Sequence, residues 1–124
     1  MAYDLNTHNV SLLAAADLSA AQYRCVSLDS NGRIIQSTAT SLTIGILQTK
    51  PTSGQFGSVA FMGVSKVALG GTVAAGARVM SNATGLGIAA TTAGNAVIGV
   101  ALEGGVTGDI VPVLLSRMPF AALA

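Results

Sequence analysis

The stretch that decides the fold of this chain reads Gly45-Ile46-Leu47-Gln48-Thr49-Lys50-Pro51-Thr52-Ser53-Gly54-Gln55-Phe56-Gly57-Ser58-Val59. An apolar run opens on Gly45, a centre rich in turn residues follows, and Gly54 precedes a second apolar run. Apolar runs separated by Gly, Pro and Ser are typical of β-hairpins. A second copy of the pattern runs from Gly99-Val100-Ala101-Leu102-Glu103 to Gly108-Asp109-Ile110-Val111-Pro112-Val113. Both stretches are therefore predicted to be β-hairpins.

The two copies lie 54 residues apart, which indicates an internal duplication. This offset aligns residues 23–59 with residues 77–113 and gives nine identities, where about three or four are expected by chance. The identical pairs are Arg24/Arg78, Ser27/Ser81, Ile34/Ile88, Thr38/Thr92, Ala39/Ala93, Ile44/Ile98, Gly45/Gly99, Gly54/Gly108 and Val59/Val113. Each half alone is too short to bury a core. We therefore expect one small domain, a β-barrel or β-sandwich, that contains the motif twice.

Strand and turn signals cover most of the chain after residue 16. Asn31-Gly32 lies between two apolar runs and is a strong hairpin signal, because both residues accept positive φ at little cost. No segment keeps a period of 3.6 residues over three turns, so the protein is predicted to be mostly β. The predicted strands are 23–28, 33–37, 43–48, 57–62, 64–69, 78–81, 87–90, 96–103 and 109–116.

The first 16 residues have a different character. They begin with polar residues and end in a short apolar run, without alternation of apolar and polar positions. We expect residues 1–16 to form an extended N-terminal arm that becomes ordered when it meets a surface. Residues 17–124 are expected to form a single β domain.

The last two long strands are apolar on both faces. Successive residues of a strand point to opposite faces, and nearly all residues of 97–102 and 110–115 are apolar. In a small barrel one face fills the interior, so the other face is expected to be buried by another chain. Val111, Val113 and Leu115 are the candidate oligomer interface.

Composition favours a protein whose surface is covered by partners. Only 9% of the 124 residues are charged, against about 25% in typical soluble domains. The simplest cover is other copies of the chain or a partner protein. The alternative is that Ala and Gly raise the apolar fraction without creating adhesive patches.

Charge and hydropathy argue against several classes of function. The net charge is +1 and the six basic residues are scattered, which does not favour nucleic acid as a partner. No apolar run approaches the ~20 residues of a membrane span, and residues 1–6 lack the features of a signal peptide. The single cysteine excludes an intrachain disulfide and fits synthesis in a reducing cytoplasm.

Catalytic signals are weak. The segment Gly85-Leu86-Gly87-Ile88-Ala89-Ala90 matches a dinucleotide fingerprint, but Thr91-Thr92-Ala93-Gly94 cannot continue as the helix that this fingerprint requires. Cys25 lies in an apolar strand and is expected to be structural, and His8 lies in the arm, where it cannot be held as a general base. One histidine and one cysteine do not suggest a metal site. No catalytic, cofactor-binding or metal-binding residue is assigned, and the protein is not expected to be an enzyme.

Several segments together resemble a known family, the small capsid cement (head decoration) proteins of tailed bacteriophages. The resemblance covers residues 14–116, and the segments that carry it are Asp17-Leu18-Ser19-Ala20-Ala21-Gln22-Tyr23-Arg24, Gly45-Ile46-Leu47-Gln48-Thr49-Lys50-Pro51, Gly63-Val64-Ser65-Lys66-Val67 and Val97-Ile98-Gly99-Val100-Ala101-Leu102-Glu103. The resemblance implies a structural virion protein that is a homotrimer. It implies binding to the outer surface of an icosahedral head, where the protein stabilises contacts between major capsid subunits. The location implied is the virion capsid surface, after synthesis in the cytoplasm of the bacterial host.

The resemblance also implies that the N-terminal arm becomes ordered on the capsid. The candidate capsid-binding residues are Ala2, Tyr3, Asp4, Leu5, Asn6, Thr7, His8, Asn9 and Val10. Two other functions stay open: a small β module on the virion surface that attaches to a host glycan or protein, and an enzyme. The binding module predicts exposed aromatic residues on loops, and the enzyme predicts a cleft with convergent titratable groups.

Overall fold

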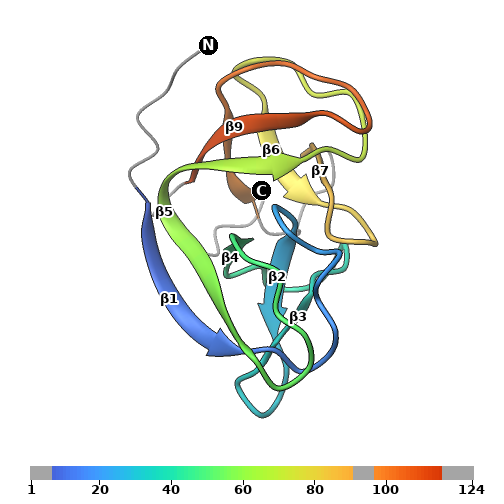
Figure 1. Ribbon diagram of the computed structural model, residues 1–124. Helices are drawn as coiled ribbons and strands as arrows, with labels where there is room; N and C mark the ends of the chain where they lie inside the picture. The colour runs from blue at the N-terminus through green and yellow to red at the C-terminus, as the bar shows by residue number, and fades with distance from the viewer. Residues whose placement is uncertain (1–6, 91–96, 116–124) are drawn as a thin grey trace.

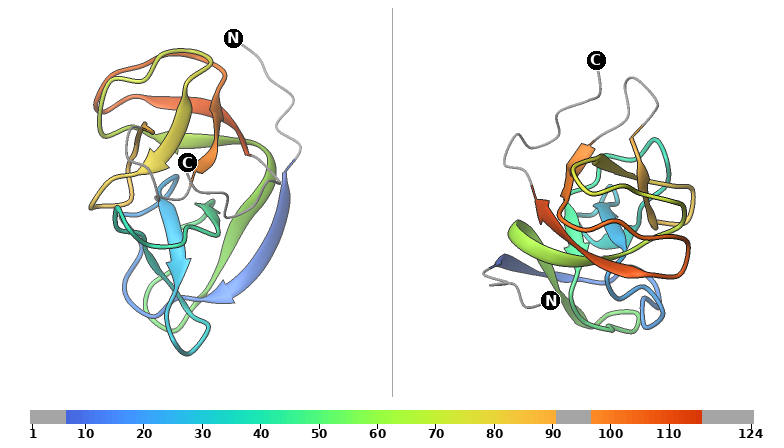
Figure 2. Two further views of the ribbon diagram at one scale, coloured as in Figure 1. Left: turned by 180° about the vertical axis from the view of Figure 1, so that it is seen from behind. Right: turned by 90° about the horizontal axis from the view of Figure 1, so that it is seen from above.

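The computed structural model describes residues 7–90 and 97–115, and its regular elements in those ranges are all β-strands (Figure 1). The strands are β1 (His8–Leu13), β2 (Cys25–Leu28), β3 (Ile34–Gln36), β4 (Gly45–Leu47), β5 (Phe56–Ala68), β6 (Arg78–Ser81), β7 (Gly87–Ala89), β8 (Val97–Ala101) and β9 (Ile110–Leu115). They form one antiparallel sheet in the order β3-β2-β4-β5-β9-β8-β6-β7, with β1 paired to β5. The sheet is strongly curled into a half-barrel (Figure 2). The predicted fold class is confirmed.

Strand β5 joins the two halves of the sheet. It is 13 residues long and turns sharply between its two ends, and Gly63 near its middle has φ +100°, a conformation that favours glycine (Figure 1). Its first half pairs with β1 and β4, and its second half pairs with β9. We call residues 8–62 the first lobe and residues 63–115 the second lobe.

The lobes repeat one another in their backbone hydrogen bonds. The N–H of Gly54 donates to the carbonyl oxygen of Ala14 at 3.0 Å, and the N–H of Gly108 donates to that of Leu69 at 3.1 Å. Gly54 and Gly108 both have positive φ, at +82° and +95°. Equivalent turns are thus closed by equivalent bonds, and the predicted duplication is confirmed.

Side chains that close the turns are repeated as well. Oδ1 of Asp29 accepts two backbone N–H groups of the turn between β2 and β3, and Oδ1 of Asn82 accepts two in the turn between β6 and β7. Such Asx turns fix the backbone locally, because a side-chain oxygen replaces a backbone acceptor. The tight β2–β3 hairpin predicted from Asn31-Gly32 is present.

The spacing of the repeat varies slightly along the chain. Strand pairings place β4 and the first half of β5 on β8 and β9 with the offset of 54, so that Gly45 is equivalent to Gly99. They place β2 and β3 on β6 and β7 with an offset of 53, and this makes Cys25 equivalent to Arg78. The ungapped alignment that paired Arg24 with Arg78 is therefore one residue out of register there, because the connecting loops differ in length.

Two apolar cores lie within the curled sheet. The core of the first lobe is made of Ala14, Leu18, Ala21, Val26, Ile34, Leu47 and Val59. The second, larger core is made of Val67, Leu69, Val73, Val79, Ile98, Ala101, Val111, Val113 and Leu115 together with three residues of the first lobe, Cys25, Ile46 and Ala60. The first lobe therefore contributes side chains to the core of the second.

The N-terminal segment differs from its expectation. Strand β1 pairs with β5 from His8↔Met62 to Leu13↔Phe56, and its course along the first half of β5 is visible in Figure 1. From His8 onward the segment does not wait for a foreign surface, because β5 offers backbone groups that pair with it. Residues 1–6 lie outside the described residues, and an arm that ends at residue 16 stays a prediction.

Candidate functional site

Exposed apolar side chains, rather than a catalytic cleft, mark the functional surface of the described residues. Large apolar side chains that are at least one third exposed are Val10, Leu28, Leu42, Phe56, Val100, Val106, Ile110 and Leu114. Single exposed apolar residues are ordinary on protein surfaces, whereas contiguous ones mark contact sites. Three groups follow from the strand pairing: the β1 edge, the outward face of β8 and β9, and a groove beside β2.

The β1 edge carries the described part of the predicted capsid-binding segment. Ala2 to Asn6 lie outside the described residues. Thr7 is half-buried, and the side chains of His8, Asn9 and Val10 are exposed. The ring of His8 lies 6.4 Å from the ring of Phe61, and His8 is thus placed at the surface of the sheet. This edge of the sheet presents polar and apolar side chains with no charge that opposes a neutral partner.

The outward face of β9 corrects the predicted oligomer interface. Val111, Val113 and Leu115 have exposed fractions of 5%, 0% and 6% and lie in the second core, so they cannot also contact a second copy. Ile110 and Leu114, which alternate with them, are 53% and 47% exposed. The apolar run did not reveal which face of the strand points inward. The structure places any interface of β9 on the opposite face.

On this outward face one residue from each of three neighbouring strands forms a row. Arg78 of β6 is the cross-strand partner of Val100 of β8, and Val100 is the partner of Leu114 of β9. Cross-strand partners lie close enough for their side chains to touch. Arg78, Val100 and Leu114 are all exposed. We call these three residues the outer row.

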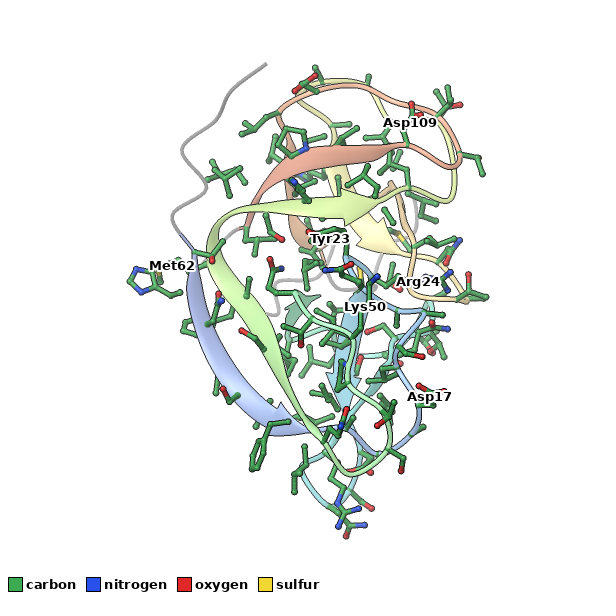
Figure 3. All side chains as sticks on the ribbon, viewed as in Figure 1. Asp17, Tyr23, Arg24, Lys50, Met62 and Asp109 are labelled. Atoms are coloured by element: carbon green, nitrogen blue, oxygen red, sulfur yellow. The ribbon has the colours of Figure 1, made fainter. Side chains whose placement is uncertain are left out.

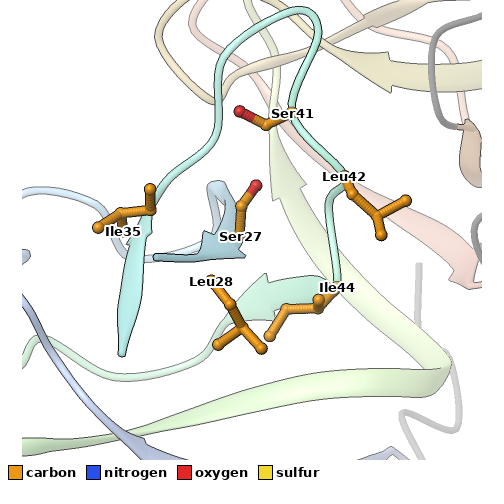
Figure 4. A pocket seen from close by; sticks show the side chains of 6 residues that line it. All are labelled: Ser27, Leu28, Ile35, Ser41, Leu42 and Ile44. Atoms are coloured by element: carbon orange, nitrogen blue, oxygen red, sulfur yellow. The ribbon is translucent and has the colours of Figure 1, made fainter. Parts of the chain in front are cut away.

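A shallow apolar groove opens on the first lobe. It has a volume of about 240 Å³ and is lined by Ser27, Leu28, Ile35, Ser41, Leu42 and Ile44 (Figure 4). Leu28 lies beside Ile44, and Leu42 forms the far wall (Figure 4). The hydroxyl of Ser27 is hydrogen-bonded to that of Ser37, so its polar atom is already satisfied within the chain. We call this site the Leu28 groove.

Contacts between the lobes surround Tyr23 and Arg24 (Figure 3). The ammonium group of Lys66 lies 5.8 Å from the centre of the Tyr23 ring, a cation–π arrangement. Nη1 of Arg24 donates to the carbonyl oxygen of Thr84 at 3.3 Å. The N–H of Cys25 donates to the carbonyl oxygen of Gly85 at 2.7 Å. These polar contacts and the shared core hold the lobes in one arrangement.

The residues weighed as catalytic do not come together. Cys25 is fully buried, and burial raises the pKa of its thiol to about 12, so the thiolate is disfavoured. His8 is exposed on β1. The segment that matched the dinucleotide fingerprint forms a turn and strand β7, not the start of a helix. Within residues 7–90 and 97–115, no three His, Cys, Asp or Glu side chains gather as metal ligands.

Membrane-spanning helices were also sought in the described ranges. None of the helices there, since the segments are strands, has the length and hydropathy to cross a bilayer.

Sequence reasoning missed the β1 pairing and the Leu28 groove. The groove has no motif of its own, because residues 27, 28, 35, 41, 42 and 44 come from two strands and a loop. A usable signal was the exact alternation around Ser27 and Leu28 in a short strand, which forces one of these side chains to face outward.

Comparison with known proteins agrees with the fold. The phage cement protein family matches residues 5–115. No curated protein sequence matches the chain. A crystal structure of the N base of head fiber gp8.5 from bacteriophage phi29 superposes with a TM-score of 0.71 at 15% identity, covering 90% of this chain and 96% of that one. At this identity the likeness shows a shared fold. The family match extends over nearly the whole chain, and the protein therefore belongs to the phage cement protein family, a family of structural, capsid-associated phage proteins.

Proposed function

We propose that this protein binds the outer surface of an icosahedral phage capsid as a homotrimer and stabilises contacts between several major capsid subunits. Family membership supports association with the capsid. The structural neighbour is described as the base of a head fiber, which is also a component of a phage head. The chain would be made in the cytoplasm of the bacterial host and act on the surface of the virion.

The observation that carries the proposal is the exposed edge at β1. In the sheet this strand is paired along one side with β5, and the side chains of His8, Asn9 and Val10 face solvent. An edge strand can accept a further strand through backbone hydrogen bonds, with alternate side chains providing specificity. Residues 2–10 would use this edge to contact the shell.

Such contacts need no chemistry to stabilise a shell. Each contact of one copy can be weak, because linking copies makes the later contacts intramolecular and raises avidity by about 10² to 10⁴. A protein that binds the assembled shell and not its separated subunits favours the assembled state by mass action. The low charge of the chain, 9% of residues, is compatible with a surface that is largely covered after binding.

Sedimentation with expanded, decoration-free capsids tests this proposal. We expect the full chain to pellet with capsids in a saturable number per shell. Deletion of residues 2–6, which leaves β1 intact, and Val10→Asp, at a position that is 40% exposed, should each reduce the bound fraction. Val106→Asp, on an exposed loop of the other lobe, is the control and should bind normally. Full-length protein that stays in the supernatant would refute capsid binding.

One observation favours attachment to a host surface as a second candidate. Phe56 is 68% exposed directly after the loop that precedes β5. An exposed aromatic residue on a loop is what a glycan-binding or protein-binding module would present. Among the described residues this is a single exposed aromatic, so we rank this candidate second. Loss of cell binding by virions that carry Phe56→Ala, with normal decoration of the capsid, would favour it.

A further inference from the structure

The two lobes are alike in structure but differ in what covers them. In the first lobe, Cys25 pairs with Ile46 and Ile46 pairs with Ala60, and together they form a row across three strands. We call these three residues the inner row. All three are fully buried, because they belong to the core of the second lobe. The inner row is thus the surface through which the first lobe packs against the second.

The equivalent surface of the second lobe is uncovered. The strand pairings place Arg78, Val100 and Leu114, the outer row, where the first lobe has Cys25, Ile46 and Ala60. Ile46 and Ala60 are 0% exposed, whereas Val100 and Leu114 are 36% and 47% exposed. The outer row therefore has the position of an inter-lobe contact but lacks a lobe to contact within the chain.

The receiving side of the contact shows the opposite difference. In the second lobe the inner row meets Ser81, whose hydroxyl is hydrogen-bonded to the thiol of Cys25, and Gly85, whose carbonyl accepts the N–H of Cys25. Ser81 and Gly85 are buried. Their equivalents in the first lobe are Leu28 and Gly32, and both of these residues are exposed.

The receiving surface of the first lobe coincides with the Leu28 groove. Ile98, in the second core, corresponds to Ile44, which lies beside Leu28 in that groove. The first lobe therefore has an open receiving groove, and the second lobe has an open row that would fill such a groove. Each chain presents one half of the inter-lobe contact at each end.

We propose that copies of this chain assemble head to tail, with the outer row of one copy seated in the Leu28 groove of the next. This contact repeats between chains the packing that joins the two lobes within a chain. It deepens the oligomer in the proposed function by naming its surfaces, and it requires no contact with the capsid. A contact between two different surfaces closes into a ring when its rotation permits, and a ring of three copies matches the proposed homotrimer.

The side chains suit such a contact. Val100, Leu114 and the groove residues Leu28 and Ile44 are apolar, so their contact removes apolar area from water on both sides. Arg78 can lay its aliphatic stem along Leu28 and keep its guanidinium at the rim. These residues are bulkier than Cys25, Ala60 and Ser81, which fits surfaces that meet between chains rather than within one tightly packed fold.

Disulfide trapping tests the contact directly. Arg78 and Leu28 occupy the positions of Cys25 and Ser81, whose side chains touch within the chain. A mixture of Arg78→Cys and Leu28→Cys should form a covalent dimer under mild oxidation, while neither variant alone should. Cys25 is buried and is not expected to compete. Val106→Cys mixed with Leu28→Cys is the control pair. A dimer yield no higher than that of the control pair would overturn the proposal.

Charge substitutions give an independent test in solution. Leu114→Asp and Leu28→Asp should each convert the oligomer to monomer at sedimentation concentrations, with association weakened roughly 100-fold or more because a carboxylate would be buried without a partner. Since each variant keeps the surface that the other lacks, an equal mixture should form dimers and nothing larger. Phe56→Asp, outside both surfaces, should leave the oligomer intact. Wild-type monomer, or a mixture without dimers, would contradict the proposal.

The two proposals fail separately. Circular dichroism and thermal unfolding of each variant establish that it is folded before its association is interpreted. If the chain pellets with capsids but the cysteine pair does not trap a dimer, the head-to-tail contact is wrong and capsid binding stands. If the pair traps a dimer but no protein pellets with capsids, the reverse holds.

Discussion

Replacing Gly99 by alanine should be among the most destabilising single-methyl changes in this protein. Gly99 lies in β8, and a Cβ there would fall 2.9 Å from the carbonyl carbon of Leu114, 3.0 Å from the Cα of Leu115 and closer still to the carbonyl oxygen of Leu114. Carbon atoms in ordinary contact are about 3.5 to 4.0 Å apart. The obstacle is backbone, so no side chain can rotate away, and β8 and β9 must separate.

The expected cost follows from that separation. Overpacking of a core costs about 1 to 3 kcal/mol. Moving β8 away from β9 also weakens the hydrogen bonds near the pairs Gly99↔Leu115 and Val100↔Leu114, at about 1 kcal/mol for each bond lost. Alanine lowers the entropy of the unfolded chain, which offsets roughly 0.5 to 1 kcal/mol. A net loss of about 3 kcal/mol is a large share of the roughly 5 to 15 kcal/mol that stabilises a domain.

Urea unfolding at equilibrium, followed by circular dichroism, measures this loss. Gly76→Ala is the matched control, because a Cβ there meets nothing within 4 Å and only φ +85° opposes it, at about 1 to 2 kcal/mol. The internal repeat adds a second check: Gly45, the equivalent of Gly99, faces the backbone of Ala60 in the same way, so Gly45→Ala should cost a similar amount. A free energy of unfolding for Gly99→Ala that equals or exceeds that of Gly76→Ala would refute the reasoning.

Three further predictions concern the core, the turns and the thiol. Val113→Asp should unfold the chain or cost more than about 4 kcal/mol, because it buries an unpaired carboxylate, whereas Leu114→Asp, one residue on, should leave the thermal midpoint nearly unchanged. Asp29→Ala and Asn82→Ala each remove a side-chain oxygen that accepts two backbone N–H groups, so each should lower the free energy of unfolding by about 1 to 2 kcal/mol in urea titrations. Cys25 should resist thiol reagents at pH 8 until the protein unfolds. Since its pKa is raised from 9.0 to about 12 on folding, the unfolded state loses this proton first, and stability relative to Cys25→Ala should decrease as pH rises between those values; equal slopes for the two proteins would contradict this.

Local sequence signals predicted most strands because turn residues punctuate the chain. Asn31-Gly32 and the glycines at 54 and 108 adopt the positive φ that such turns require, and the strands between them follow. The duplication was visible because Gly45 and Gly99 occupy equivalent positions where two backbones approach closely. These features act locally, within one turn or one pair of strands.

Long-range packing explains what the sequence did not show. β1 pairs with residues about 50 positions further along, and its own residues carry no alternation that would announce a strand. In β9 both faces are apolar, so the inward face could not be read from hydropathy, and Val111, Val113 and Leu115 were assigned to the wrong side. The difference between the inner and outer rows depends on how the lobes pack, and it became visible only when equivalent residues were compared for burial.

Electron cryomicroscopy of capsids decorated with the full chain tests the central claim most directly. The account predicts extra density on the outside of the shell where major capsid subunits meet, with a two-lobed shape that fits residues 7–115, β1 turned toward the shell, and three copies joined through their second and first lobes. A shell that looks the same with and without the protein, or density only at the tail or inside the head, would contradict it.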